Sequence, residues 1–226
     1  VEEEMPDIIS SGSPALDEAL EVDGFPMQGI IEFAGEQGSG KTTVALHLIA
    51  EAQKLGKICA YIDVARQYSV EYASAIGIDT KALLVSQVDD PKALALAEML
   101  VRTSAVELVV IELDSHAHRH LPPDRIANQL ASVAIALGAL VFVTYKIPAD
   151  LSPGDLNVRM GYTSNFRRFA NVSLRGEHLF HSRENGPITT GARITVTKNR
   201  YGAKEHPTVE LRFRSDQGYE RPSCPA

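Results

Sequence analysis

The sequence predicts an α/β domain with a mainly parallel central sheet, flanking helices and a C-terminal antiparallel extension. Through the first two thirds of the chain, short continuous apolar runs alternate with segments of helical spacing. Beyond about residue 170, apolar and polar residues alternate, as in strands with one solvent-facing side. The length of 226 residues and the apolar share of 44% fit a single domain over 1–226 with a sizeable core.

The predicted elements follow one another with short connections. A short helix is expected after Ser13, which would cap it, with Pro14 at its first position. The expected buried strands are 29–34, 58–62, 83–85, 108–111 and 139–143. The expected helices are 41–54, 70–76, 91–101 and 123–137. Strands and helices in this order are typical of a parallel sheet covered on its faces.

The pattern breaks over residues 146–164, which contain Pro148, Pro153, Gly154 and Gly161. We expect a long loop there, and loops of this length usually carry function or are disordered. Three further strands, expected to pair antiparallel, complete the chain at 172–174, 194–197 and 209–213.

Charge and cysteine content limit the class of protein. The net charge of −7 disfavours indiscriminate nucleic-acid binding, yet residues 159–204 carry nine basic residues against two acidic ones. That segment is either a face adapted to phosphates or a mixed solvated surface.

Cys59 and Cys224 are too few for a disulfide framework or a cysteine-based zinc site, and Cys59 is expected to be a reduced core residue. No signal peptide opens the sequence, and no run approaches the about 20 apolar residues of a membrane span. We therefore expect a cytoplasmic protein without membrane association.

A glycine-rich loop between the first long strand and its helix is the clearest functional motif. It consists of Gly35, Glu36, Gln37, Gly38, Ser39, Gly40, Lys41 and Thr42. The pattern G-x-x-x-x-G-K-[ST] between a strand and a helix predicts a phosphate-binding loop. Its backbone N–H groups would surround the phosphates, Lys41 would reach the β- and γ-phosphates, and the Thr42 hydroxyl would ligate Mg²⁺. We expect ATP and Mg²⁺ as cofactors.

The chain resembles the RecA recombinase family over roughly residues 8–214. The likeness is carried by the segments 9–17, 25–43, 56–63 and 72–87. This resemblance implies a RecA-like core, binding of ATP or ADP, assembly into a homo-oligomer with nucleotide at subunit interfaces, and DNA repair or recombination on single-stranded DNA. It also indicates that the family's N-terminal polymerisation segment and C-terminal domain are absent from this sequence.

The resemblance assigns roles to particular positions. Tyr72 matches the tyrosine that stacks on adenine, and Thr43 follows Thr42 as in the family. Lys198 and Arg200 resemble the basic pair that reaches a neighbouring subunit's ATP. Candidates for contacts to DNA phosphates are Arg159, Arg167 and Arg168, with Tyr162 the best placed aromatic residue for base stacking.

Other positions depart from the family. The family's catalytic glutamate lies two residues after Asp63, where this chain has Ala65, and its sensing glutamine corresponds to Tyr145. Loss of a general base typically lowers a rate by on the order of 10²–10⁴. The family has an aspartate directed at Mg²⁺ after the strand expected at 108–111. The matching carboxylate here is expected to be Glu112, where the apolar run ends, with Asp114 as the alternative.

The segment after that strand also differs, because the family's first DNA-binding loop is largely deleted. Its short replacement contains His116, His118 and His120, which would share one face of an extended segment. They are either a solvated polar turn or part of a metal site.

Three functional hypotheses follow. The first is a divergent RecA-like protein in repair or recombination that binds ATP and hydrolyses it slowly or not at all. The second is an accessory module, resembling the RecA-like partners of error-prone polymerases, in which ATP stabilises a complex. The third is an active DNA-dependent ATPase in which Asp63, Glu112 or a neighbouring subunit replaces the missing glutamate.

Overall fold

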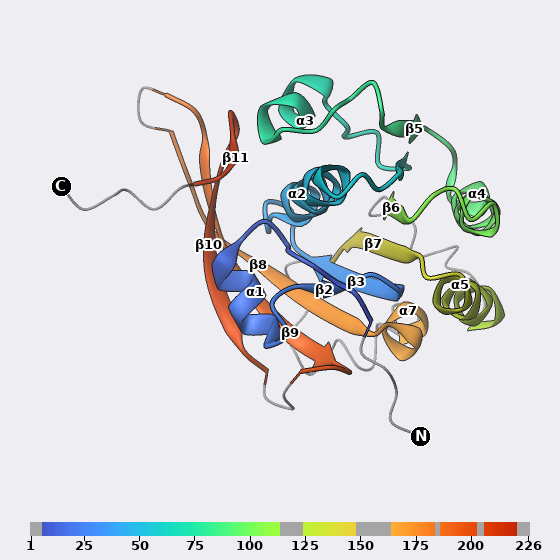
Figure 1. Cartoon of the computed structure of the whole chain (residues 1–226). Coiled ribbons are helices and arrows are strands. Elements are labelled where there is room, and N and C mark those ends of the chain that lie inside the picture. The colour runs from blue at the N-terminus through green and yellow to red at the C-terminus, as the bar shows by residue number, and fades with distance from the viewer. Residues whose placement is uncertain (1–5, 114–123, 148–163, 184–185, 203–205, 221–226) are drawn as a thin grey trace.

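The fold is a large mixed sheet with helices on both faces (Figure 1). The structure is a computed structural model that describes residues 6–113, 124–147, 164–183, 186–202 and 206–220. The main sheet has the strand order β11-β10-β9-β8-β3-β7-β6-β4-β5. This architecture confirms the predicted α/β class, the mainly parallel centre and the antiparallel extension.

The parallel part of the sheet forms from the continuous apolar runs. Its strands are β3 (Gly29–Gly35), β4 (Cys59–Asp63), β5 (Leu84–Ser86), β6 (Leu108–Glu112) and β7 (Leu140–Lys146). β3 lies between β7 and β8, and β6 lies between β7 and β4. Because all five strands run in the same direction, their carboxyl ends meet at one edge, where α/β folds place their ligands.

Two apolar layers hold the helices to the sheet. On one face lie α1 (Pro14–Leu20), α2 (Lys41–Lys54) and α3 (Val70–Ile76). On the other lie α4 (Asp90–Arg102), α5 (Asp124–Ala136) and α7 (Ser164–Phe169). Successive strand residues alternate between the layers, so Ile31 and Phe33 pack under α2 whereas Ile30 and Ala34 pack under α5. This alternation decides which side chains at the strand ends can reach a ligand.

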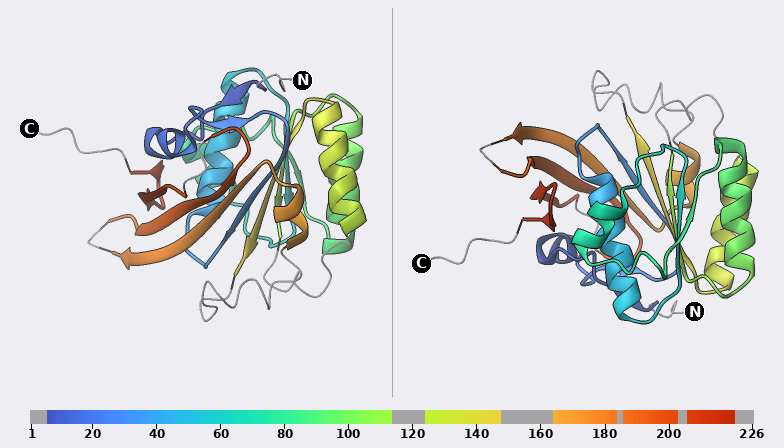
Figure 2. Two further views of the ribbon diagram at one scale, coloured as in Figure 1. Left: turned by 90° about the horizontal axis from the view of Figure 1, so that it is seen from below. Right: turned by 90° about the horizontal axis from the view of Figure 1, so that it is seen from above.

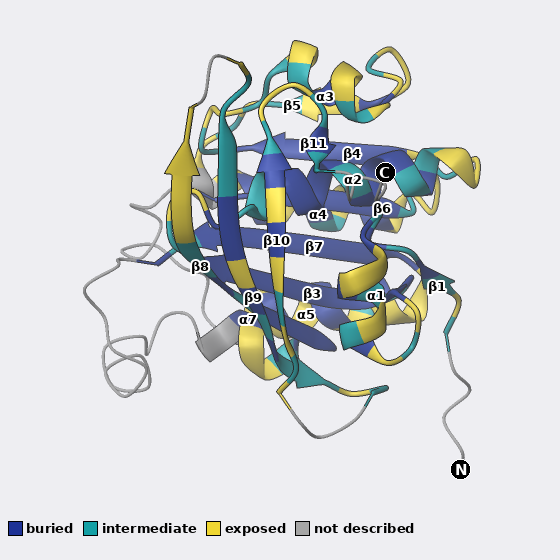
Figure 3. Ribbon diagram, turned by 90° about the vertical axis from the view of Figure 1, so that its left-hand side faces the viewer, coloured by how far each residue is buried: buried dark blue, intermediate teal, exposed yellow. Residues whose placement is uncertain are grey.

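The C-terminal strands β8 (Val172–Ser182), β9 (Thr189–Asn199), β10 (Thr208–Arg214) and β11 (Gly218–Tyr219) extend the sheet beyond β3. The antiparallel prediction for 172–174 is only half correct, because β8 pairs parallel with β3 and antiparallel with β9. β8 and β9 are also far longer than predicted, and Figure 2 shows their outer ends projecting beyond the helices. The outer half of β8 is exposed, as Figure 3 shows, so it lacks the apolar alternation that would indicate a strand.

Some local details differ from expectation. β1 (Ile8–Ile9) and β2 (Phe25–Pro26) form a small antiparallel sheet that was not predicted. Ser13 precedes α1 as expected, but its side chain makes no capping hydrogen bond. Cys59 is buried and reduced, as predicted.

The predicted loop 146–164 begins later than expected. Lys146 is the last residue of β7, and the Ile147 side chain after it is buried in the layer beneath α5. Thr144, Tyr145 and Lys146 end the apolar run, which is why the sequence pattern placed the end of the strand too early. Residues 148–163 lie outside the described part of the chain.

Candidate functional site

The glycine-rich loop connects β3 to α2, as predicted. Gly38 and Gly40 both have a φ of 80°, a left-handed conformation that favours glycine. Lys41 begins α2, and its Nζ donates to the carbonyl oxygens of Gly35 at 3.0 Å and Glu36 at 2.6 Å. The start of a helix directs free N–H groups and its positive dipole end toward the loop. This arrangement suits a phosphate chain.

Burial lowers the pKa of the Lys41 ammonium to about 8. The positive charge of Lys146 lowers it further, whereas the carboxylates of Glu112 and Glu36 raise it. A bound phosphate would favour the charged form of Lys41, because an opposite charge raises the pKa of an amine.

Glu112 and Thr42 meet at the carboxyl end of β6. The Thr42 hydroxyl donates to Oε1 of Glu112, and the buried Tyr61 hydroxyl donates to Oε2. Burial raises the pKa of Glu112. A hydroxyl and a carboxylate oxygen are ligands that Mg²⁺ prefers, so the pair fits a nucleotide-bound Mg²⁺. Asp114, the alternative carboxylate, lies outside the described residues.

Asp63, at the end of the neighbouring β4, has a different environment. Its Oδ1 accepts the Gln67 N–H at 2.9 Å, and its Oδ2 accepts the Tyr68 N–H at 3.1 Å and Gln87 Nε2 at 3.2 Å. The carboxylate is fully buried. These bonds occupy both oxygens in holding the turn after β4.

A cavity of about 210 Å³ lies against the glycine-rich loop. Its other walls are Ala65 and Gln67 after β4, Glu112 and Leu113 at the end of β6, and Thr144 and Lys146 of β7. Glu112 is the only carboxylate among the lining residues that the structure describes. Ala65, at the position that the resemblance assigns to a catalytic glutamate, thus lines the cavity. Sequence reasoning missed Gln67, Thr144 and Lys146.

A second cavity, of about 420 Å³, shares Gly40 and Thr43 with the first. Tyr72 lines it, and the Tyr72 hydroxyl lies 2.8 Å from Oγ1 of Thr43. Phe213 of β10 and Ile188 add apolar walls. The predicted adenine-stacking residue therefore lies beside the glycine-rich loop, in a mainly apolar cavity of suitable size for a base. Phe213 was missed because it is remote in the sequence and looks like an ordinary strand residue.

Tyr145 does not face the loop. Its side chain lies in the layer beneath α5, and its hydroxyl donates to Oε1 of the buried Glu32. Burial raises the pKa of Glu32 to about 7, although the charges of Arg167 and Lys198 oppose this shift. The position that matches the family's sensing glutamine is therefore turned away from the cavity.

Lys198 lies near α7. Its Nζ donates to the carbonyl oxygens of Arg167 at 2.8 Å and Arg168 at 3.2 Å, the last turn of α7. Burial, followed by the charge of Arg200, lowers the pKa of Lys198 to about 8. A register shift in the β8–β9 pairing separates Lys198 from Val196, whose side chain packs in the layer beneath α2. This irregularity turns Lys198 to the face that carries α7, away from the chain's own glycine-rich loop.

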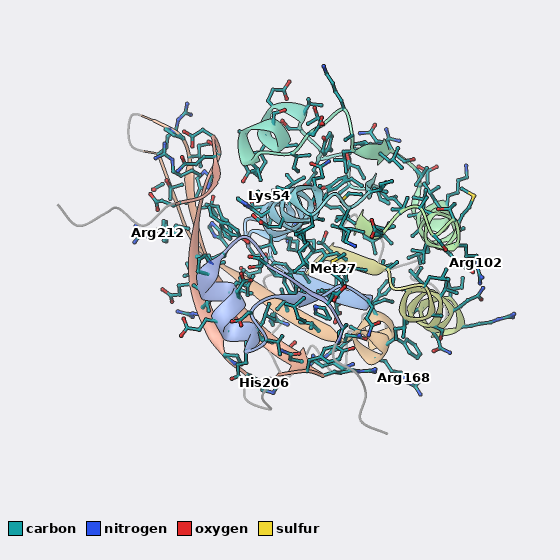
Figure 4. The ribbon with its side chains drawn as sticks, in the orientation of Figure 1. Met27, Lys54, Arg102, Arg168, His206 and Arg212 are labelled. Atoms are coloured by element: carbon teal, nitrogen blue, oxygen red, sulfur yellow. The ribbon has the colours of Figure 1, made fainter. Side chains whose placement is uncertain are left out.

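The other basic candidates divide between the described and undescribed parts of the chain. Arg200 is exposed, and its N–H donates to the Asn171 carbonyl at 3.0 Å. Arg168 is labelled in Figure 4, with its guanidinium 5.6 Å from the centre of the Phe169 ring. Arg159, Tyr162 and the histidines 116, 118 and 120 lie outside the described residues.

Comparison with known proteins agrees with this geometry. Residues 2–145 match the family described as the RecA N-terminal domain. The chain belongs to the RecA family. Proteins named Protein RecA from Corynebacterium efficiens and Corynebacterium diphtheriae are 53% identical over 106 residues and 52% identical over 105 residues. Each alignment covers 46% of this chain and 28% of the relative.

The match identifies which part of this RecA-family chain is related. The matched range contains the glycine-rich loop, Glu112 and Tyr72, and it ends at Tyr145. Lys146 and the strands β8–β11 follow it. None of the helices within the described ranges is long and apolar enough to cross a membrane.

Proposed function

We propose that this RecA-family chain binds ATP with Mg²⁺ and acts in DNA repair or homologous recombination, with weak or lost hydrolysis. The observation that carries the proposal is the cavity at the glycine-rich loop. It combines the Lys41 ammonium with the Thr42–Glu112 pair but has Glu112 as its only carboxylate among the described lining residues. The Lys41 ammonium and the Thr42–Glu112 pair support binding of a Mg²⁺ nucleotide. The lack of a further carboxylate among the described lining residues supports slow turnover.

Slow hydrolysis follows from the chemistry of the cavity walls. An attacking water needs a group that orients it and accepts its proton, and the methyl group of Ala65 does neither. Glu112 is engaged by Thr42 and Tyr61, and Asp63 is engaged in the turn after β4. These contacts count against replacement of the glutamate by either residue. Gln67 could orient a water but could not take up a proton.

The nucleotide would bind at an interface between copies of the chain. Lys198 lies on the face opposite the chain's own cavity, and Arg200 follows it in an exposed position. Both could therefore reach the phosphates of a neighbouring subunit but not those of their own. Arg167 and Arg168 of the adjacent α7 remain candidates for contacts with single-stranded DNA.

An accessory module is the second candidate function. The missing carboxylate favours it, because a protein that hydrolyses ATP slowly can use the nucleotide to stabilise a complex with a repair or polymerase partner. Both functions require the same nucleotide site. They differ in whether single-stranded DNA binds and whether strand exchange follows.

The test is a nucleotide titration combined with light scattering. ATP with Mg²⁺ should bind and increase the molecular mass. Thr42→Ala should weaken ATP binding in Mg²⁺ by about tenfold, because a hydroxyl ligand of the ion is lost. Arg200→Ala should leave binding intact and reduce the ATP-dependent increase in mass. Failure of the wild-type protein to bind ATP in Mg²⁺ would overturn the proposal.

A further inference from the structure

A second lysine, Lys146 of β7, faces the cavity at the glycine-rich loop, which we call the phosphate cavity. Strand pairing places Lys146 beside Gly35, the first residue of the loop, and Thr144 beside Glu112. Lys146 and Thr144 point to the same side of β7, because residues two apart share a face. Both line the cavity. β7 therefore contributes a wall between the phosphate loop and the proposed Mg²⁺ ligands.

The polar groups of this wall are available for an anion. Lys146 Nζ donates to Oε1 of Gln37 in the loop at 3.1 Å, a neutral acceptor. Lys146 forms no ion pair with a carboxylate among the residues that the structure describes. Thr144 is fully buried, and its Oγ1 has no hydrogen-bond partner within the described ranges. An unpaired buried hydroxyl carries a free-energy cost that a ligand oxygen would relieve.

Electrostatics point to a ligand of high negative charge. Lys146 and Lys41 contribute two ammonium groups to one small cavity, and the charge of Lys146 disfavours the charged form of Lys41. Glu112 offsets part of this charge and would be neutralised further by a bound Mg²⁺. An anion between the two lysines would stabilise both ammonium groups.

The position along a bound nucleotide distinguishes the phosphates. The second cavity, lined by Tyr72 and here called the base cavity, meets the phosphate cavity at Gly40 and Thr43. Lys146 and Thr144 line only the phosphate cavity. A nucleotide with its base beside Tyr72 would thus extend along the loop toward β7. Its last phosphate would come closest to Lys146 and Thr144, between the loop and Glu112.

We propose that Lys146 and Thr144 bind the terminal phosphate of a nucleoside triphosphate and so distinguish it from a diphosphate. The inference rests on the proposed nucleotide site. It assigns recognition of the terminal phosphate to two residues that flank Tyr145 in the strand, while Tyr145 itself is turned to the opposite face.

The test compares two ligands and two lysines. Dissociation constants are measured for adenylyl imidodiphosphate and for ADP, each with Mg²⁺. Lys146→Met should weaken binding of the triphosphate analogue by about tenfold or more and of ADP by less than about threefold. The matched control is Lys54→Met, which removes the same charge at the far end of α2, where Figure 4 labels Lys54. The rise of the helix separates the backbones of Lys54 and Lys41 by about 20 Å. It should change neither constant.

Two further variants separate the contributions. Lys146→Arg retains the positive charge and should preserve the preference for the triphosphate, which also guards against a folding defect in the methionine variant. Thr144→Val should produce a smaller loss, confined to the triphosphate. An equal loss for both ligands in Lys146→Met, or no loss, would overturn the inference while leaving the nucleotide site intact. Failure of the wild-type protein to bind either ligand would overturn the nucleotide site as well.

Discussion

At the scale of single residues, Glu32 is a carboxylic acid buried in the middle of the sheet. It accepts a hydrogen bond from Tyr145, and Arg167 and Lys198 lie near enough to affect its titration. Burial nevertheless dominates and raises its pKa from 4.5 to about 7. Near neutral pH, ionisation of Glu32 therefore opposes folding.

This shift predicts a stability change with a definite sign. Between about pH 4.5 and pH 7 the folded protein retains a proton that the unfolded chain releases, so the free energy of unfolding falls as pH rises. Glu32→Gln keeps an acceptor for Tyr145 but cannot ionise. Relative to wild type, the variant should gain stability as pH rises, by up to roughly 3 kcal/mol by pH 8. Urea unfolding at pH 5, 6, 7 and 8 measures the difference.

The comparison isolates Glu32, because the other acidic residues are common to both proteins. Most of the difference in unfolding free energy should develop between pH 5 and pH 7. Parallel stability profiles for the two proteins over that range would show that Glu32 titrates with an ordinary pKa.

At the scale of elements, the antiparallel extension supports the phosphate loop. A Cβ on Gly40 would lie 2.3 Å from the Phe213 ring of β10, and Gly40 has a φ of 80°. Phe213 also lines the base cavity. β10 thus packs against the turn that positions Lys41, although the two elements are remote in the sequence.

Gly40→Ala should therefore destabilise the fold and disrupt the loop. Gly77→Ala is the matched control, because Gly77 has a φ of 108° but a Cβ there would meet nothing within 4 Å. Backbone strain alone should cost the control about 1 kcal/mol. The added clash should raise the cost for Gly40→Ala to about 3 kcal/mol. Thermal unfolding measures both, and equal costs would mean that Phe213 does not restrict the loop.

Elements differ in how far the sequence predicts them. The helices and parallel strands follow from apolar periodicity, since a buried strand or an amphipathic helix needs that pattern to pack. The full lengths of β8 and β9 were not predictable, because the exposed half of β8 lacks apolar alternation. The side-chain direction of Tyr145 follows from strand alternation only if β7 continues to Lys146. The polar residues at the end of β7 hide this continuation from the apolar pattern.

The candidate site divides in the same way. The glycine-rich loop could be predicted because its chemistry demands a contiguous motif, and Glu112 could be predicted because it ends an apolar strand. The walls formed by Thr144, Lys146 and Phe213 arise from strand pairing between remote segments. A single sequence does not specify that pairing.

At the scale of the whole molecule, the family match covers residues 2–145, whereas the proposed nucleotide site extends beyond it. Lys146, Ile188 and Phe213 line the two cavities and lie after the matched range. β8–β11 continue the same sheet, so we propose that the chain acts as one domain in nucleotide binding. Its activity should then depend on all the described elements.

Weak hydrolysis at the Ala65 cavity is tested by steady-state ATP turnover at saturating Mg²⁺, with and without single-stranded DNA, for wild type and Ala65→Glu. The wild-type protein should bind ATP but turn it over very slowly, and DNA should change this little. Ala65→Glu places a carboxylate in the cavity and should raise turnover by on the order of 100-fold. Rapid DNA-stimulated turnover by the wild-type protein, unchanged in Ala65→Glu, would rule out weak hydrolysis and place the catalytic base elsewhere.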